Sequence, residues 1–269
     1  MTAPAQPDPR PQAPGVLPSQ ALRALIAEGR ISAQTPIPAP QIQPASLDLR
    51  LGAVAHRVRA SFLAGGDATV EERLERFTMH SIDLSAGAVL EKGCVYVIPL
   101  QERLDLPADV SAAANAKSST GRLDLLTRLI TDRGEEFDRV DPGYSGPLYA
   151  EISPRSFSVL VRPGMRLNQI RLRRGSLTFS DDELRALHAR EPLVDVAPII
   201  DHGLAFSVDL TPRGDQPVGW RAKPHTGLID LDRIAAYEPS EFWEPLFPAP
   251  RGGLILDPGA FYILVSRES

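Results

Sequence analysis

A tight turn followed by a strand lies in the run Val140-Asp141-Pro142-Gly143-Tyr144-Ser145-Gly146-Pro147-Leu148-Tyr149-Ala150-Glu151. The sequence Asp-Pro-Gly predicts the turn, because proline fixes φ and glycine tolerates a positive φ. The alternation after it predicts a strand whose apolar face carries Leu148, Ala150 and Ile152. Glu151 should therefore project from the opposite face, a few residues past the turn.

A cluster of cations and hydroxyls precedes this turn, in the run Lys117-Ser118-Ser119-Thr120-Gly121-Arg122. Hydroxyls and backbone N–H groups near a glycine can surround a polyphosphate, and Lys and Arg add charge-assisted hydrogen bonds. The run therefore predicts a phosphate-binding site. Taken alone, Glu151 and each cation of the run are more often solvated surface groups than functional ones.

Turns and short apolar segments recur along the rest of the chain. Glycine and proline punctuate it at Glu91-Lys92-Gly93, at Leu106-Pro107-Ala108-Asp109 and at Arg162-Pro163-Gly164. Many short strands and few long helical periods predict a mainly β protein, a sandwich or barrel with a few short helices. Short helices are expected after Ser19 and after Ser180, where a capping residue precedes a helical pattern.

The chain divides into four segments by composition. Residues 1–18 are rich in proline and predict a disordered tail, and residues 19–179 predict the first β domain. Residues 180–197 predict a helical linker, and residues 198–269 a partial second β domain. In that last segment, Ser207-Val208-Asp209-Leu210 echoes residues 46–49, and residues 256–264 echo residues 90–98. This spacing is far longer than a solenoid repeat, so it indicates tandem domains.

Composition excludes several classes of function. The net charge of −5 and the pI near 5.6 argue against binding of a nucleic-acid polymer. No apolar stretch is long enough to span a membrane, and we expect a cytoplasmic protein. The five histidines are scattered and there is one cysteine, Cys94, so neither a zinc site nor another protein metal site is expected.

Five motifs, in order, resemble the landmarks of the dCTP deaminases in the dUTPase superfamily. They are Gln43-Pro44-Ala45-Ser46-Leu47-Asp48-Leu49-Arg50-Leu51-Gly52, Leu106-Pro107-Ala108-Asp109, the 117–122 run, the 140–151 run, and Arg162-Pro163-Gly164-Met165-Arg166-Leu167-Asn168-Gln169. The tandem layout resembles the long, two-domain form of this deaminase. If the repeat is real, the second copy is expected to be truncated, because it would end before its counterpart of residues 117–151.

The resemblance implies a distorted β-barrel or jelly-roll fold of the dUTPase type, followed by a partial second copy. It implies self-association as a homotrimer or pseudo-trimer, with sites between neighbouring subunits. It also implies hydrolytic deamination of dCTP to dUTP and ammonia, in pyrimidine deoxynucleotide metabolism and without zinc. Mg²⁺ would be bound through the triphosphate of the nucleotide.

The resemblance assigns catalysis to three residues. Glu151 falls on the catalytic glutamate, and Ser118 and Arg122 fall on its supporting serine and arginine. One carboxylate can take a proton from water and return protons to cytosine N3 and to the departing amine. Arg122 close to Glu151 would keep the carboxylate ionised and oriented.

The resemblance assigns nucleotide binding to five more residues. Lys117 and Ser119 would hold phosphate, and Asp141 would bind the 3′-hydroxyl of the sugar. Tyr144 would press on the deoxyribose, and Gln169 would lie near the nucleotide. Between the two runs this chain also carries extra residues, including Asp132-Arg133-Gly134-Glu135-Glu136, where shorter deaminases run more directly to the turn.

Two alternatives stay open at this point. One is a dUTP pyrophosphatase, or a bifunctional dCTP deaminase producing dUMP, in which Asp141 activates water. The other is a non-catalytic, nucleotide-binding trimer module, which an incomplete second copy would favour. Glu151 in the strand favours deamination.

Overall fold

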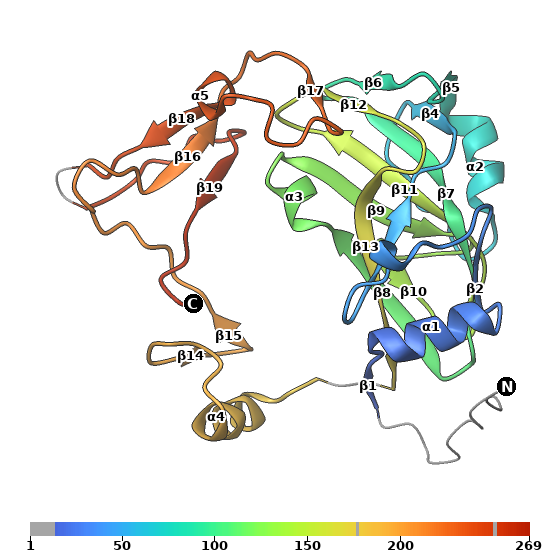
Figure 1. Ribbon diagram of the computed structural model, residues 1–269, viewed down its shortest axis with the longest axis horizontal. Helices are drawn as coiled ribbons and strands as arrows, with labels where there is room; N and C mark the ends of the chain where they lie inside the picture. The colour runs from blue at the N-terminus through green and yellow to red at the C-terminus, as the bar shows by residue number, and fades with distance from the viewer. Residues whose placement is uncertain (1–13, 176–177, 250–251) are drawn as a thin grey trace, which may run out of the picture.

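Two β-sheets face each other and enclose the main hydrophobic core (Figure 1). The structure is a computed structural model that describes residues 14–175, 178–249 and 252–269. One sheet has the order β1 (Gly15–Val16), β13 (Arg166–Arg174), β8 (Val110–Ala116) and β10 (Arg139–Val140), and β3 (Leu47–Arg50) also pairs with β13. The other has the order β5 (Thr78–Asp83), β4 (Val54–Val58), β7 (Val95–Asp105), β11 (Ser145–Pro154) and β9 (Leu125–Thr131), and β2 (Ile31–Ala33) also pairs with β7.

Smaller sheets complete the fold. Beside the barrel lies a sheet of β17 (Ile229–Asp230), β12 (Val159–Val161) and β6 (Ala88–Leu90). Further along the chain, β14 (Ile199–Ile200) pairs with β15 (Leu204–Ala205). A last sheet has the order β18 (Trp243–Leu246), β16 (Gly219–Ala222) and β19 (Tyr262–Leu264). The helices are α1 (Ser19–Ala27), η1 (Ala39–Gln41), α2 (Val70–Phe77), α3 (Ser118–Gly121), α4 (Asp181–Arg190) and α5 (Pro239–Phe242). None of the described helices is long and apolar enough to cross a membrane. The predicted mainly β fold with a few short helices is confirmed.

The alternation predicted for β11 is confirmed. Leu148, Ala150 and Ile152 are fully buried in the main core between the sheets. The opposite face of the sheet is also covered, because α2 and the segments beside it pack a second hydrophobic cluster there that includes Tyr149. Glu151 is therefore not a solvated side chain but is only 2% exposed.

The predicted turn before β11 is also confirmed. The Tyr144 amide donates to the Asp141 carbonyl at 3.2 Å, and Gly143 has a φ of +73°. This φ lies in the left-handed region, which explains the glycine.

Two of the described helices begin with a capping box. In α2 the Thr69 hydroxyl accepts from the Glu72 amide while the Glu72 carboxylate accepts from the Thr69 amide, and Ser180 and Glu183 do the same in α4. The expected cap of the first helix is different: α1 starts at Ser19 itself, and Pro18 precedes it without a side-chain cap.

The expected disordered N-terminal tail does not include residues 14–18. Residues 1–13 lie outside the described residues, whereas Gly15 and Val16 pair with β13 in an antiparallel ladder. Leu17 is only 5% exposed and belongs to the main core. The expectation of disorder up to residue 18 is therefore corrected for residues 14–18, because an apolar side chain and an edge of the sheet were available to fix them.

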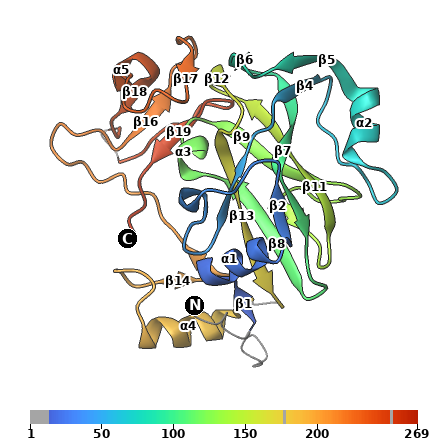
Figure 2. The same ribbon diagram turned by 45° about the vertical axis from the view of Figure 1, so that its right-hand side comes forward.

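The C-terminal region packs against the barrel (Figure 2). Strand β17 runs parallel to β12 and extends its sheet. Phe157 of the barrel, 1% exposed, contacts the rings of Phe242 and Trp243 edge-on, with centroids 5.8 and 5.3 Å away. The two parts thus share apolar surface that neither would bury alone.

The three-stranded C-terminal sheet repeats an arrangement of the barrel. The order β18-β16-β19 matches β5-β4-β7, and Arg221 lies opposite Tyr262 as Arg57 lies opposite Tyr96. The turns before β7 and β19 also agree, since the tyrosine hydroxyl accepts from a backbone amide five residues earlier at 3.0 and 2.8 Å. Residues 207–210, by contrast, form no strand like β3. The interpretation of residues 198–269 as a partial second domain stays a prediction. The matching strand order and the matching arginine–tyrosine pairs favour it.

Candidate active site

One open cavity of about 310 Å³ gathers five of the predicted site residues. Strand β8 and the short helix α3 bring four of them to its wall, and β13 brings the fifth. The five are Lys117, Ser118, Ser119, Arg122 and Gln169. Gln43 and Asp48 complete the lining.

The local backbone explains this grouping. Strand β8 ends as the Lys117 amide donates to the Leu167 carbonyl of β13 at 3.0 Å, and the chain then turns into α3. Ser118, Ser119 and Arg122 point their side chains to the exposed side. Gln169, on the neighbouring strand, accepts a hydrogen bond from the Ser46 hydroxyl at 2.9 Å. The predicted phosphate run therefore presents two hydroxyls and two cations to one cavity.

Lys117 is not a free cation in this arrangement. Its Nζ forms an ion pair with Oδ2 of Asp48, which also lies 3.6 Å from the Arg166 guanidinium. The other carboxylate oxygen of Asp48, Oδ1, is buried and has no hydrogen-bond partner among the described residues. A buried carboxylate oxygen without a partner is costly. It is therefore a group that a bound ligand or cation would satisfy.

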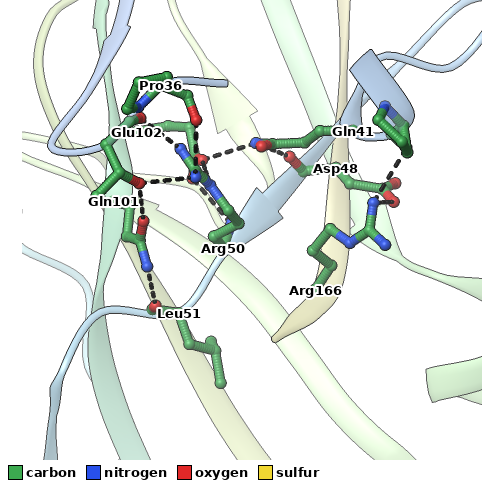
Figure 3. A network of polar contacts seen from close by, with 10 residues as sticks. Pro36, Gln41, Asp48, Arg50, Leu51, Gln101, Glu102 and Arg166 are labelled. Atoms are coloured by element: carbon green, nitrogen blue, oxygen red, sulfur yellow. Dashed lines mark hydrogen bonds and ion pairs between the residues drawn. The ribbon is translucent and has the colours of Figure 1, made fainter. Parts of the chain in front are cut away.

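A buried polar network fixes the strand that carries Asp48 (Figure 3). Glu102, 1% exposed, accepts from the Arg50 guanidinium at 2.7 Å, from the Arg50 amide at 2.8 Å and from the Gln41 amide group at 2.7 Å. Each buried charge is thus paired and hydrogen-bonded, which a buried ion pair requires. The network joins β3 to β7 and holds Asp48 in place.

A second cavity of about 540 Å³ adjoins the first and shares Lys117 and Ser119 with it. Its opposite wall comes from the C-terminal region, through Leu231, Asp232 and Ile234. The C-terminal region is therefore close to the residues that were expected to bind phosphate.

Glu151 lies apart from this group, on β11 opposite Arg128 of β9. Its Oε1 accepts from Arg128 through Nε at 3.2 Å and also through Nη2. Its Oε2 is buried and has no hydrogen-bond partner among the described residues. One carboxylate oxygen is thus fixed by a cation, and the other is left for a further partner.

Asp141 and Tyr144 lie at the turn before β11. Asp141 is exposed and accepts from the Arg139 guanidinium at 3.0 Å. The Tyr144 hydroxyl donates to the Pro147 carbonyl at 2.6 Å and accepts from the Asp132 amide at 3.2 Å. Burial raises the pKa of Tyr144 well above its usual value, so this side chain stays a neutral hydrogen-bonding group.

The single chain does not bring the three predicted catalytic residues together. Within the described part of the chain, the hydrogen bonds of the Glu151 side chain go to Arg128 alone, and none reaches Ser118 or Arg122. The roles given to these three residues stay predictions. Sequence reasoning missed Arg128, because the pairing depends on the register of β9 against β11 rather than on a motif.

A protein-built metal centre has no candidate in the described ranges. Residues 14–175, 178–249 and 252–269 contain no group of three or more His, Cys, Asp or Glu side chains placed to hold a metal ion. A divalent cation bound at Asp48 would therefore take its remaining ligands from a bound molecule or from water.

Known proteins resemble this chain along most of its length. Residues 13–176 match the family model of the N-terminal domain of 2′-deoxycytidine 5′-triphosphate deaminase, and residues 180–269 match that of its C-terminal domain. The crystal structure of 2′-deoxycytidine 5′-triphosphate deaminase from Agrobacterium tumefaciens is 52% identical and superposes with a TM-score of 0.91, over 95% of this chain and 76% of that one.

Curated relatives agree with these matches. A protein of Beutenbergia cavernae named dCTP deaminase, dUMP-forming, is 31% identical over 150 residues, which cover 55% of this chain and 74% of the relative. A dCTP deaminase of Natronomonas pharaonis is 28% identical over 153 residues, which cover 55% of this chain and 75% of the relative. The motifs, the barrel and both family models agree, and this chain belongs to the dCTP deaminase family of the dUTPase superfamily.

Proposed function

We propose that this chain catalyses the hydrolytic deamination of dCTP to dUTP and ammonia, as a step of pyrimidine deoxynucleotide metabolism. The observation that carries the proposal is Glu151, a buried carboxylate with Oε1 fixed by Arg128 and Oε2 without a partner. Family membership and the related deaminase structure support dCTP as the substrate.

Glu151 acts as both base and acid in this proposal. It takes a proton from water as the water oxygen adds to C4 of cytosine. It gives this proton to N3, then takes the second proton of the added water from the C4 hydroxyl and passes it to the amine. The C4 carbonyl forms as the C4–N bond breaks, and ammonia leaves. Water supplies the new carbonyl oxygen at C4 of the uracil ring, so the reaction balances without zinc or a redox partner.

Nucleotide binding would involve two groups of residues, one lining the 310 Å³ cavity and one at the turn before β11. Lys117 and Ser119 would hold phosphate in the 310 Å³ cavity, where Gln169 also lies. Asp141, exposed at its turn, would accept from the 3′-hydroxyl, and Tyr144 would pack against the sugar. Lys117 can serve a phosphate while paired with Asp48, because an ammonium group has three donors.

Mg²⁺ would arrive on the triphosphate. Asp48 lines the cavity beside Lys117, and its buried Oδ1 has no hydrogen-bond partner among the described residues, so this carboxylate would offer an additional ligand to a nucleotide-bound cation. Mg²⁺ supplies charge neutralisation of the phosphates when bound. Oxygen ligands of this kind suit Mg²⁺ rather than zinc.

The assembly would be a homotrimer, or a pseudo-trimer built from fewer chains. Ser118 and Arg122 line one cavity, whereas Glu151 lies elsewhere with Arg128. A neighbouring subunit that presents Ser118 and Arg122 to Glu151 would unite the three residues in one site. We further propose a cytoplasmic protein, since the substrate is a cytoplasmic nucleotide.

A second candidate is a bifunctional enzyme that takes dCTP to dUMP. It is favoured by the relatives of Beutenbergia cavernae and Coprothermobacter proteolyticus, 31% and 32% identical, which are named dUMP-forming. One assay separates the two activities. The protein is incubated with dCTP and Mg²⁺, ammonia is measured, and dUTP, dUMP and pyrophosphate are resolved.

Ammonia with dUTP supports the first proposal, and ammonia with dUMP and pyrophosphate supports the second. Binding of dCTP without ammonia would contradict both and leave the nucleotide-binding module. The same assay after treatment with a zinc-selective chelator, with Mg²⁺ restored, should give an unchanged rate.

A further inference from the structure

Residues 132–138, between the two site runs, form a loop that is anchored at both ends and lies beside Arg128, the partner of Glu151. At its start, the Asp132 carboxylate accepts from the Val70 amide at 2.8 Å, and the Arg133 amide donates to the Ala68 carbonyl at 2.9 Å. At its end, the Asp138 carboxylate accepts from the Leu129 amide at 2.7 Å. The 132–138 loop is therefore anchored on both sides of its one aromatic residue, Phe137.

Phe137 lies against the cation that holds Glu151. The Cζ atom of Arg128 is 3.7 Å from the centre of the Phe137 ring, close enough for a strong cation–π contact. The Ser61 hydroxyl accepts a further hydrogen bond from Arg128 at 3.0 Å. Ring, hydroxyl and carboxylate thus hold the guanidinium in one orientation.

The conformation of Asp138 supports this arrangement. Asp138 has a φ of +62°, in the left-handed region that is uncommon for residues other than glycine but that aspartate adopts more readily than most. The pKa of Asp138 is raised because its carboxyl is partly buried. The backbone adopts this left-handed conformation at the residue that directly follows Phe137.

We infer that Phe137 is a positioning residue for Glu151, acting through Arg128. The ring and Ser61 fix the guanidinium, the guanidinium fixes Oε1, and Oε2 is directed to the water that attacks C4. The inference rests on the proposed function of Glu151. The inference gives the 132–138 loop a role in the rate of the chemical step rather than in nucleotide binding.

The test compares Phe137→Leu with Phe137→Tyr and with Phe77→Leu. Leucine removes the ring, tyrosine keeps it, and Phe77 lies under another guanidinium, that of Arg59, at 5.6 Å in the same hydrophobic cluster. We expect kcat to fall about tenfold in Phe137→Leu with KM within about twofold, because misplacement of a catalytic group affects the transition state. Phe137→Tyr and Phe77→Leu should keep kcat within about twofold.

A second readout does not depend on activity. The ring current of Phe137 should displace the Nε–H resonance of Arg128 in the wild type and in Phe137→Tyr, and the displacement should disappear in Phe137→Leu. If Phe137→Leu does not fold, Ser61→Ala tests whether the restraint on the Arg128 guanidinium affects the rate. We expect kcat to fall about threefold at constant KM.

Three results would overturn the inference: an unchanged kcat in Phe137→Leu, an equal loss in Phe77→Leu, or no rescue by tyrosine. For Ser61→Ala, the corresponding result is an unchanged kcat. A wild-type protein without ammonia release, or an active Glu151→Gln variant, would instead overturn the proposed function on which the inference rests.

Discussion

Arg162, directly after β12, donates to both carboxylate oxygens of Asp230 in β17, at 2.7 and 3.0 Å. A further bond to Asp232, at 2.8 Å, ties down the segment whose residues line the 540 Å³ cavity. The Arg162 guanidinium also holds the pKa of Asp230 below its usual range. One arginine of the barrel thus fixes the part of the C-terminal region nearest to the expected phosphate site.

Arg162→Met should release this segment without unfolding the barrel. The amides of Ile229 and Leu231, which bond to carbonyls of the 158–160 segment, should exchange about tenfold faster with deuterium, because local opening becomes easier. Hydrogen exchange measured by mass spectrometry checks this. Arg213→Met is the control, since Arg213 is exposed and pairs with Asp209, away from residues 229–231 in the sequence. Equal exchange of residues 229–231 in wild type and Arg162→Met would contradict the assignment.

Phe242→Ala should destabilise the contact between barrel and C-terminal region. Phe242 is 4% exposed and packs edge-on against Phe157, so its truncation should lower the free energy of unfolding by about 3 kcal/mol. Both tryptophans, Trp220 and Trp243, lie in the C-terminal region, so their fluorescence during urea denaturation reports the transition there. Phe247→Ala, at a 55% exposed position, serves as control. A loss no larger than in that control would count against the shared core.

Asp124→Asn should stabilise the protein as the pH rises. Burial raises the pKa of Asp124 in the folded state, so its protonated form contributes stability that is present below the unfolded pKa near 3.8 and lost as pH rises through the folded pKa. Asparagine keeps the neutral form and tolerates the φ of +51°. The Tm of the variant relative to wild type should therefore increase between pH 4 and 7.

The expected gain is about 2 °C, small because the carboxyl is only half buried and partly screened by water. Thermal unfolding at several pH values measures it. Asp67→Asn, whose side chain is 92% exposed, should show a constant difference from wild type. A Tm difference between Asp124→Asn and wild type that shrinks as the pH rises would contradict the prediction.

Mixing two inactive variants tests whether the site is shared between chains. Glu151→Gln keeps Arg122, and Arg122→Gln keeps Glu151. If each site combines Glu151 of one chain with Arg122 of the next, random mixed oligomers should recover about one quarter of wild-type ammonia release. Each variant alone, refolded in the same way, is the control. No recovery from verified mixed oligomers would place both residues in one chain.

The local features of the fold were predictable from the sequence. The alternation in the 140–151 run correctly placed Leu148 and Ala150 in the core and Glu151 on the other face. The Asp-Pro-Gly turn and the capping box of Ser180 were also recognisable, because each depends on residues within a few positions of one another. Four side chains of the 117–122 run, those of Lys117, Ser118, Ser119 and Arg122, also line one cavity, while their roles stay predictions.

Features that depend on distant pairing were not predictable. The partner of Glu151 follows from the register that sets Arg128 opposite it, and no local signal fixes that register. The burial of Glu151 follows from the segments that cover the outer face of the sheet, including Phe137. Likewise, nothing near Arg162 in the sequence indicates that Asp230 lies beside it.

Glu151→Gln tests the central claim most directly. Glutamine keeps the shape of the side chain but removes the charge and the ability to accept a proton from water. Ammonia release from dCTP with Mg²⁺ is measured beside the affinity for dCTP by calorimetric titration. We predict a loss of ammonia release of at least about a thousandfold with a Kd within about threefold of wild type. Ammonia release at a rate close to wild type would contradict the role of Glu151 as the general base.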